Sequence, residues 1–214
     1  MTASGGDMLK IWDMRSPFHV GALLLDQDEI STMAFDPSGQ VVAVAMQNMH
    51  ESCRDTVCDL HFFDVRNFTN GPFLEKSIKS QTFGHVPVDF RVQRLKFDLP
   101  GHRILAVTND YRHLVIDAFD GNLLSEISGY TPLKNTMGGY QADWTPCGKY
   151  IATGSGDGVV QIFDPSQGDP VAMLESDSAA QVQCIAYNHR LELLTTCSDN
   201  TMSFWLPKLN KDEK

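Results

Sequence analysis

The chain has 214 residues, of which 42% are hydrophobic and 21% charged, and its formal net charge is −10. This composition is typical of a globular protein and excludes a disordered polymer. The negative charge disfavours sequence-independent binding of nucleic acids, because the chain repels phosphate backbones. Five scattered cysteines favour a reducing compartment over a disulfide framework. Short apolar runs and a polar first ten residues predict neither a membrane span nor a secretion signal.

Four segments repeat one pattern: an aromatic residue, a short turn, and an apolar run that ends in small or hydroxyl residues. They cover residues 33–45, 95–108, 142–155 and 185–198. Three of the turns combine proline with glycine, which is typical of β-hairpins. The fourth turn, at residues 188–191, contains neither. Each segment predicts two antiparallel strands.

A second motif follows each pair of strands and consists of an aromatic or aliphatic residue, usually with aspartate next. Its middle residues recur 42 to 53 positions apart. We expect its aromatic side chains to pack between neighbouring repeats. A short further strand comes after each copy. The motif residues are Trp12, Asp13, Phe63, Asp64, Asp117, Phe163, Asp164 and Trp205.

An aspartate stands five or six residues before most copies of this motif. A carboxylate in a turn can accept backbone N–H bonds and so fix a hairpin. We expect that role for Asp7, Asp110, Asp157 and Asp199.

Four strands per repeat and no helical period predict an all-β fold, a β-propeller with one four-stranded blade per repeat. We expect one domain over residues 1–208 followed by a charged tail at 209–214. It would contain partial blades at 1–28 and 182–208, and complete blades at about 30–80, 92–130 and 140–176. The partial blades do not add up to one blade, so we expect an incomplete propeller that lacks N-terminal blades.

Several stretches resemble the WD repeat-containing protein 82 family, which is similar to the WD-repeat subunit of yeast COMPASS. They lie at 4–17, 62–73, 114–130, 144–158 and 202–207. The unusual sequences Ile-Asp-Ala-Phe and Phe-Trp-Leu-Pro, within the third and fifth stretches, make the resemblance specific. Residues 47–59 and 81–94 depart from the family.

The resemblance implies a nuclear, non-catalytic WD-repeat propeller without a cofactor. The implied partners are subunits of histone lysine-4 methyltransferase complexes, phosphatase complexes that act in RNA 3′-end processing and transcription termination, and the phosphorylated tail of RNA polymerase II. Sequence-specific nucleic-acid binding is not expected. The alternative is a substrate receptor of a ubiquitin ligase or a general intracellular adaptor. An enzyme is disfavoured because the glycine-rich residues 154–158 lie between strands and no nucleophile motif is present.

Thiol and imidazole side chains gather at His50, Cys53, Cys58 and His61. Such groups bind zinc, but this spacing is not one of the usual paired patterns. We expect a solvated loop without a metal, with zinc as the alternative.

Basic residues are concentrated at 66–112, where eight face only four acids. In the blade arrangement, one end of a blade brings together Arg91, Arg94, Arg112 and His113. Paired guanidinium groups bind phosphate well, which predicts a phosphopeptide contact; a solvated face is the alternative. Other partner contacts are expected from aromatic residues outside the motif, namely Phe18, Phe68, Phe73 and Phe83.

Overall fold

The computed structural model describes residues 2–4, 8–25, 29–47, 56–79, 90–109, 112–129, 131, 141–175, 180–188 and 190–207. The chain divides into two compact units, Met1–Glu126 and Ile127–Lys214. In the described ranges the regular structure consists of antiparallel strands and one 3₁₀ turn, η1 (Phe68–Asn70). No helix in these ranges has the length and apolar character that crossing a membrane requires.

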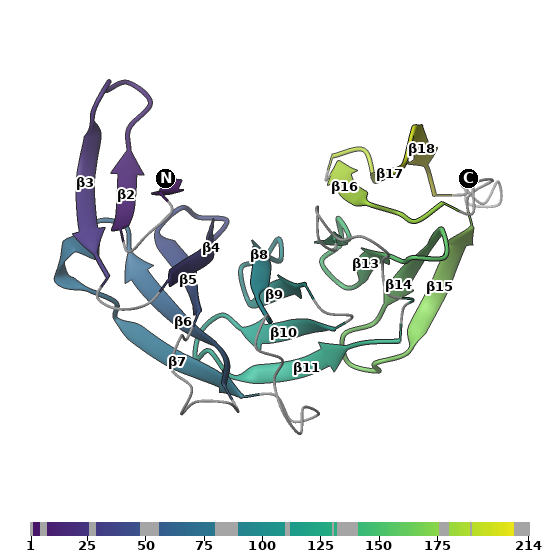
Figure 1. Ribbon diagram of the computed structural model, residues 1–214, viewed down its shortest axis with the longest axis horizontal. Coiled ribbons are helices and arrows are strands. Elements are labelled where there is room, and N and C mark those ends of the chain that lie inside the picture. Colours follow the sequence, from purple (N-terminus) through teal and green to yellow (C-terminus); the bar gives the residue numbers. More distant parts are fainter. Residues whose placement is uncertain are drawn as a thin grey trace, which may run out of the picture. The chain divides into compact units, whose positions relative to one another are not determined.

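The first unit contains three sheets, which are followed from purple to teal in Figure 1. The first sheet comprises β1 (Thr2–Ser4), β2 (Met8–Trp12) and β3 (His19–Leu24). The second comprises β4 (Glu29–Phe35), β5 (Val41–Gln47), β6 (Thr56–Asp64) and β7 (Leu74–Lys79). The third comprises β8 (Val92–Phe97), β9 (Arg103–Thr108), β10 (His113–Asp117) and β11 (Leu123–Ile127).

The second unit contains two sheets. One comprises β12 (Ala142–Trp144), β13 (Ile151–Gly154), β14 (Val159–Phe163) and β15 (Pro170–Glu175). The other comprises β16 (Cys184–Asn188), β17 (Leu193–Ser198) and β18 (Thr201–Trp205). Within every sheet the strands lie in chain order.

This architecture confirms the predicted all-β class with WD-type four-stranded sheets. The four hairpins form where the repeats predict them. In each sheet, at least one further strand follows the hairpin. In the N-terminal sheet, which corresponds to the predicted partial blade at 1–28, Thr2–Ser4 pairs with β2 as an additional strand. The prediction of a single domain over residues 1–208 stays a prediction.

Each of the four repeat hairpins is closed by a polar side chain directly after the aromatic residue. The Asp36 carboxylate accepts the backbone N–H of Val41 at 2.7 Å. Asn188 accepts the N–H groups of Arg190 and Leu191. Its hairpin lacks glycine, and Glu192 instead takes a positive φ of 50°. Asp98 and Thr145 accept equivalent backbone N–H bonds in their own hairpins.

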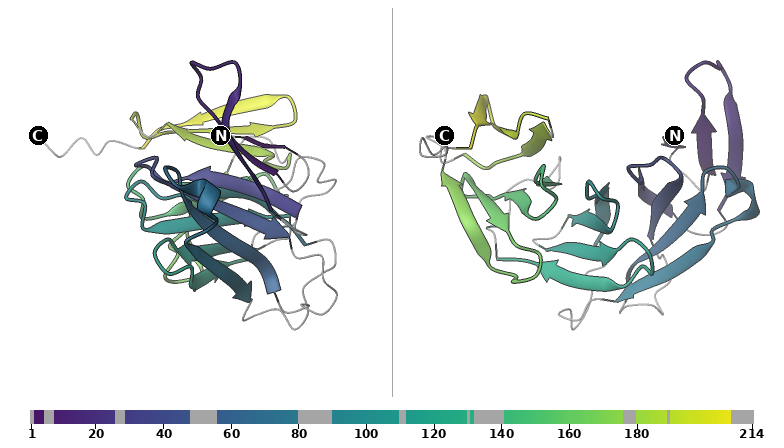
Figure 2. Two further views of the ribbon diagram at one scale, coloured as in Figure 1. Left: turned by 90° about the vertical axis from the view of Figure 1, so that its left-hand side faces the viewer. Right: turned by 180° about the vertical axis from the view of Figure 1, so that it is seen from behind.

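Both faces of the β4–β7 sheet are covered by other sheets of the first unit. Phe62 and Phe63 are neighbours on β6, so they point to opposite faces, yet both are fully buried. Phe62 belongs to a core that includes Ile104 of β9, and Phe63 to a core that includes Leu9 of β2. Figures 1 and 2 show the β4–β7 sheet between the other two sheets of this unit. Burial on both faces is the packing expected of propeller blades.

The two sheets of the second unit share an apolar core of the same kind. Val160 of β14 packs with Ile185 and Leu194 of the following sheet. Gly154 at the end of β13 allows a close approach, because an added Cβ would lie 2.6 Å from the carbonyl oxygen of Val182. A glycine is therefore needed where these two segments meet.

Removing the carboxylate of Asp98 is expected to weaken the β8–β9 hairpin strongly. The group is 1% exposed and accepts two backbone N–H bonds. It also binds the Arg103 guanidinium at 2.9 Å. Asp98→Ala leaves these donors unsatisfied, and we expect a loss of about 2–3 kcal/mol in the free energy of unfolding, measured by denaturant titration.

Asp64→Ala provides the comparison for Asp98→Ala, because Asp64 pairs with Arg66 on the surface. Water screens that exposed ion pair, so its loss should be clearly smaller. Equal losses for the two variants would contradict the role assigned to burial at Asp98.

Candidate protein-binding surface

A pocket of about 460 Å³ opens beside the second sheet of the first unit. Its walls come from the β4–β5 turn, the end of β6, and the segment from η1 to β7. Polar side chains predominate, and Phe73 contributes an aromatic ring that is 60% exposed. The lining residues are Gln40, Val41, Asp64, Arg66, Asn67, Asn70, Gly71, Pro72 and Phe73.

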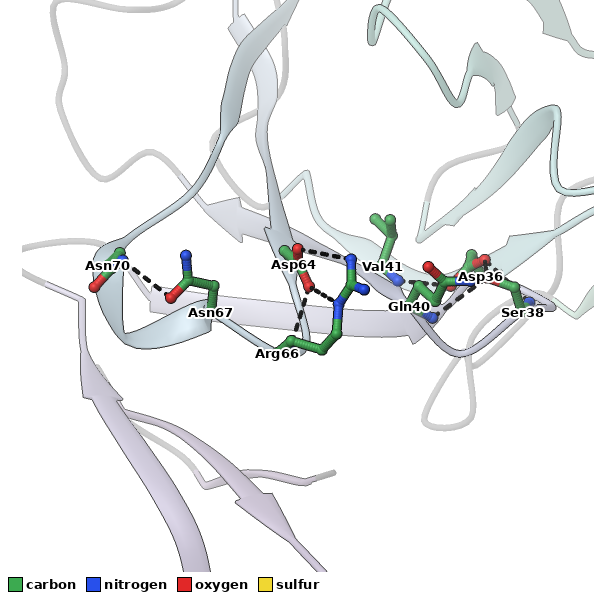
Figure 3. Close-up of polar contacts among 8 residues, drawn as sticks. All are labelled: Asp36, Ser38, Gln40, Val41, Asp64, Arg66, Asn67 and Asn70. Carbon is green, nitrogen blue, oxygen red and sulfur yellow. Dashed lines mark hydrogen bonds and ion pairs between the residues drawn. The ribbon is translucent and has the colours of Figure 1, made fainter.

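An ion pair between Asp64 and Arg66 forms one wall of this pocket (Figure 3). The backbone N–H of Arg66 donates to Asp64 Oδ1 at 2.9 Å. The guanidinium donates to both carboxylate oxygens, at 3.2 and 3.3 Å. The bonds from Arg66 hold the pKa of Asp64 below its usual value. Asp64 therefore stays charged and keeps the guanidinium in place.

The segment after Asp64 bends sharply and shapes the rest of the pocket. The Asn70 amide donates to Asn67 Oδ1 at 3.0 Å. Gly71 has φ +90°, a conformation that favours glycine. The Phe68 ring is buried beneath β3, so close that a Cβ on Gly21 would lie 2.2 Å from it. The turn is thus anchored from below while its polar groups face solvent.

The aspartates of the second motif share one local role. Each accepts the backbone N–H of the residue two positions later, at 2.7 to 2.9 Å, and so fixes the turn that follows the motif strand. This is observed at Asp13, Asp64, Asp117 and Asp164.

The aromatic residues of the same motif differ in burial. Phe63 and Phe163 are fully buried, as predicted. Trp205 is half-buried against its core and donates its indole N–H to Thr196 at 2.9 Å. The core prediction is wrong for Trp12, which is 40% exposed and lies edge-on to the His19 ring.

Two of the four predicted turn aspartates, Asp157 and Asp199, lie within the described residues. Asp157 accepts the Val159 N–H and the Thr131 hydroxyl. Desolvation acts to raise its pKa, but hydrogen bonds from Ser155, Thr131 and backbone groups together lower it. Asp199 accepts a 3.4 Å bond from the Gln183 amide. Asp7 and Asp110 lie outside the described residues.

The loops that carry Arg91 and Arg112 are joined by hydrogen bonds. Arg91 and Asn109 exchange two hydrogen bonds, at 2.8 and 3.0 Å. The Thr108 hydroxyl donates to the carbonyl of Arg112. The segments before β8 and before β10 therefore share one end of the sheet. Arg91 and Arg94 are exposed, and Arg112 is half-buried.

His113 does not lie with them on the surface. It is the first residue of β10 and is 0% exposed. Desolvation lowers its pKa to about 3, so the imidazole is neutral at physiological pH. Its inclusion among the phosphate-contacting residues is wrong, because His113 lies at the buried start of β10 and not in the exposed loop before that strand.

The zinc alternative can be examined at two of its four residues, since His50 and Cys53 lie outside the described ranges. Cys58 and His61 are three positions apart on β6 and therefore point to opposite faces. Burial raises the pKa of the Cys58 thiol to about 12, which disfavours the thiolate that zinc requires. The two side chains do not form a common ligand pair.

Among the loop aromatics, Phe18 and Phe73 are exposed and Phe68 is buried. Phe83 lies outside the described residues. The pocket-lining residues Asn67 and Asn70 were not predicted as a site. The sequence nevertheless contained an indication of this site, because the turn after the motif strand is longer here than the corresponding turns of the other sheets.

Comparison with known families finds the WD domain, G-beta repeat, at residues 140–164 and 168–205. These two matches cover most of the second unit. They coincide with the strands from β12 to β18, where the sheets have the expected order.

Similar proteins extend this relationship to nearly the whole chain. WD repeat-containing protein 82 of Drosophila melanogaster is 31% identical over 93% of this chain and 56% of its own length. The COMPASS component SWD2 of Saccharomyces cerevisiae is 23% identical over 96% of this chain and 60% of its own length. The Set1 complex component swd2 of Schizosaccharomyces pombe is 24% identical over 72% and 40%, respectively.

The chain spans between 40% and 60% of the length of these relatives. The resemblance found from the sequence is confirmed. The chain therefore contains WD-type repeats at residues 140–164 and 168–205, and along 93% of its length it resembles WD repeat-containing protein 82.

Proposed function

We propose that this chain is a non-catalytic scaffold subunit of a nuclear Set1/COMPASS-type histone methyltransferase complex. The observation that carries the proposal is similarity, over most of the chain, to WD repeat-containing protein 82 and to two proteins named as COMPASS or Set1 complex components. Such a subunit acts by holding other proteins in place, so its chemistry is that of its surfaces.

The fold supports this role. The β4–β7 sheet is buried on both faces and forms a rigid support, and exposed turns at the ends of the sheets are individually braced by carboxylates. Binding residues on loops that a rigid scaffold positions are a common arrangement in proteins. In the described part of the chain, no three metal-binding side chains lie close enough to hold an ion.

The test is affinity purification of the full tagged chain from nuclei, followed by quantitative mass spectrometry. We expect a Set1-type methyltransferase and its companion subunits to be enriched over a control purification. Enrichment of cullin-type adaptors without methyltransferase subunits would support the ubiquitin-ligase alternative and overturn the proposal.

A finer part of the proposal concerns phosphatase and 3′-end-processing complexes and the phosphorylated tail of RNA polymerase II. It is supported by the shared position of the Arg91 and Arg112 loops and by the exposure of Arg91 and Arg94. Guanidinium groups bind phosphate through paired, charge-assisted hydrogen bonds.

We expect the double variant Arg91→Ala/Arg112→Ala to bind a phosphorylated polymerase-tail peptide about tenfold more weakly, because charge-assisted hydrogen bonds are lost. Fluorescence polarisation measures this affinity. The control is Arg190→Ala, an exposed arginine of the second unit. Unchanged affinity in the double variant, or an equal loss in the control, would remove the phosphopeptide contact from the proposal.

A further inference from the structure

We propose that the end of the first unit that carries the pocket is a docking surface for an extended peptide with apolar anchors and basic residues. This inference deepens the proposed scaffold function by naming the kind of segment that a partner presents. It concerns the two complete sheets, β4–β7 and β8–β11, and the turns at the end where Asp64 lies.

Contacts join the turns of the two sheets into one continuous surface. A Cβ on Gly101, in the β8–β9 turn, would lie 3.2 Å from Pro37 of the β4–β5 turn. A Cβ on Gly121, in the β10–β11 turn, would lie 2.9 Å from Lys76 of β7 and 3.6 Å from the Phe62 ring. Phe62 in turn lies 6.4 Å from Phe73, between ring centroids, at the pocket. The pocket and both turns of the neighbouring sheet are therefore adjacent.

Large apolar side chains are exposed along this surface. Phe73 is 60% exposed, Leu99 58% and Phe119 71%. The Phe119 ring is steadied by His102, with 5.6 Å between ring centroids. Rigid exposed aromatics beside a pocket are typical anchors of protein interfaces. They favour a partner that brings its own aliphatic or aromatic side chains.

The charge of the same turns decides which partner fits. Two of their carboxylates, Asp64 and Asp98, form ion pairs with Arg66 and Arg103. Among the described residues, no ion pair neutralises the remaining three, which are Asp36, Asp117 and Asp120. Each of these accepts hydrogen bonds from its own turn and is thus held in position. An acidic rim around apolar anchors complements lysine and arginine side chains and repels acidic segments.

The experiment is selection of random 12-residue peptides displayed on phage against the immobilised full chain. Selected peptides are then synthesised and their affinities measured by fluorescence polarisation. We expect them to combine arginine or lysine with aromatic or aliphatic residues, and to bind more weakly as salt concentration rises. Recovery of acidic peptides, or of no binding peptide, would overturn the proposal.

Variants locate the binding site. Phe73→Ser/Phe119→Ser should weaken binding by about tenfold or more, because exposed aromatic anchors dominate such interfaces. Asp120→Asn removes one charge but keeps an acceptor for the Asn122 N–H, and should weaken binding by about two- to fivefold. The matched control is Val171→Ser/Met173→Ser, two exposed apolar residues of β15 in the second unit. Unchanged affinity in the aromatic variant would overturn the proposal.

Different results would refute the Set1/COMPASS assignment and the docking surface. Peptide binding that depends on Phe73 and Phe119, without a methyltransferase in the purified complex, would refute only the Set1/COMPASS assignment. Purification of an intact complex together with peptide binding that is indifferent to both residues would refute only the docking surface.

Discussion

Replacing either Phe62 or Phe63 with alanine is expected to lower the free energy of unfolding by about 3–5 kcal/mol. The two residues point to opposite faces of β6, and both are fully buried. In a sheet with one solvated face, one of them would be exposed and its loss nearly neutral. Two equal large losses follow only if neighbouring sheets cover both faces. Denaturant unfolding of the two single variants measures this.

The control for these variants is Phe73→Ala, which removes a ring of the same size from a side chain that is 60% exposed. We expect its effect to stay within about 0.5 kcal/mol. A large loss for only one of the two buried phenylalanines would show that one face of this sheet is solvated.

Acid is expected to destabilise the fold through His113. Its pKa is about 3 in the buried site, whereas an unfolded histidine titrates near pH 6.5. Between these values the unfolded chain binds a proton that the folded chain does not. Stability therefore falls as the pH decreases from about 6.5, by about 1.4 kcal/mol per pH unit. Denaturant titrations at pH 7, 6 and 5 test the sign and the slope.

His113→Gln removes the titrating group and should flatten this pH dependence between pH 6.5 and 4.5. Turn carboxylates such as Asp157, whose pKa is lowered, contribute only at more acidic pH, near and below about 4. A variant that keeps the full slope would show that His113 is not the source of the acid sensitivity.

The hairpins were predictable because their turn residues act locally. Asp36 and Asp98 stand beside the prolines and glycines of the repeats, and the structure shows them accepting the bonds that close each turn. Even the hairpin without glycine forms, because Asn188 supplies the acceptor and Glu192 the positive φ.

Burial was less predictable, because it depends on neighbours that are remote in the sequence. His113 stands beside a polar loop in the sequence, but in the structure it is the first residue of β10 and is fully buried. Trp12 carries the same motif as Phe63, yet it is exposed, because motif identity does not fix what packs against the ring. The strand Thr2–Ser4 has no distinctive pattern and is defined only by its pairing with β2.

The pocket could be predicted from the sequence only in part. Its Asp64 belongs to a recurring motif, so the turn was predictable as a feature. Its volume results from the bend at Gly71 and from the burial of Phe68 against Gly21 of another sheet, which no local pattern reveals. The adjacency of Phe73 and the β10–β11 turn likewise arises only from packing of two sheets.

Mutual burial of sheet faces is the basis on which the turns become a binding scaffold, and amide hydrogen exchange tests it most directly. β5 is buried on both faces, whereas four of the six residues of β3 are exposed. We predict that amides of β5 exchange only with the slow global unfolding of the unit, far behind those of β3. Equally fast exchange in both strands would contradict a fold that is held together by sheets covering one another.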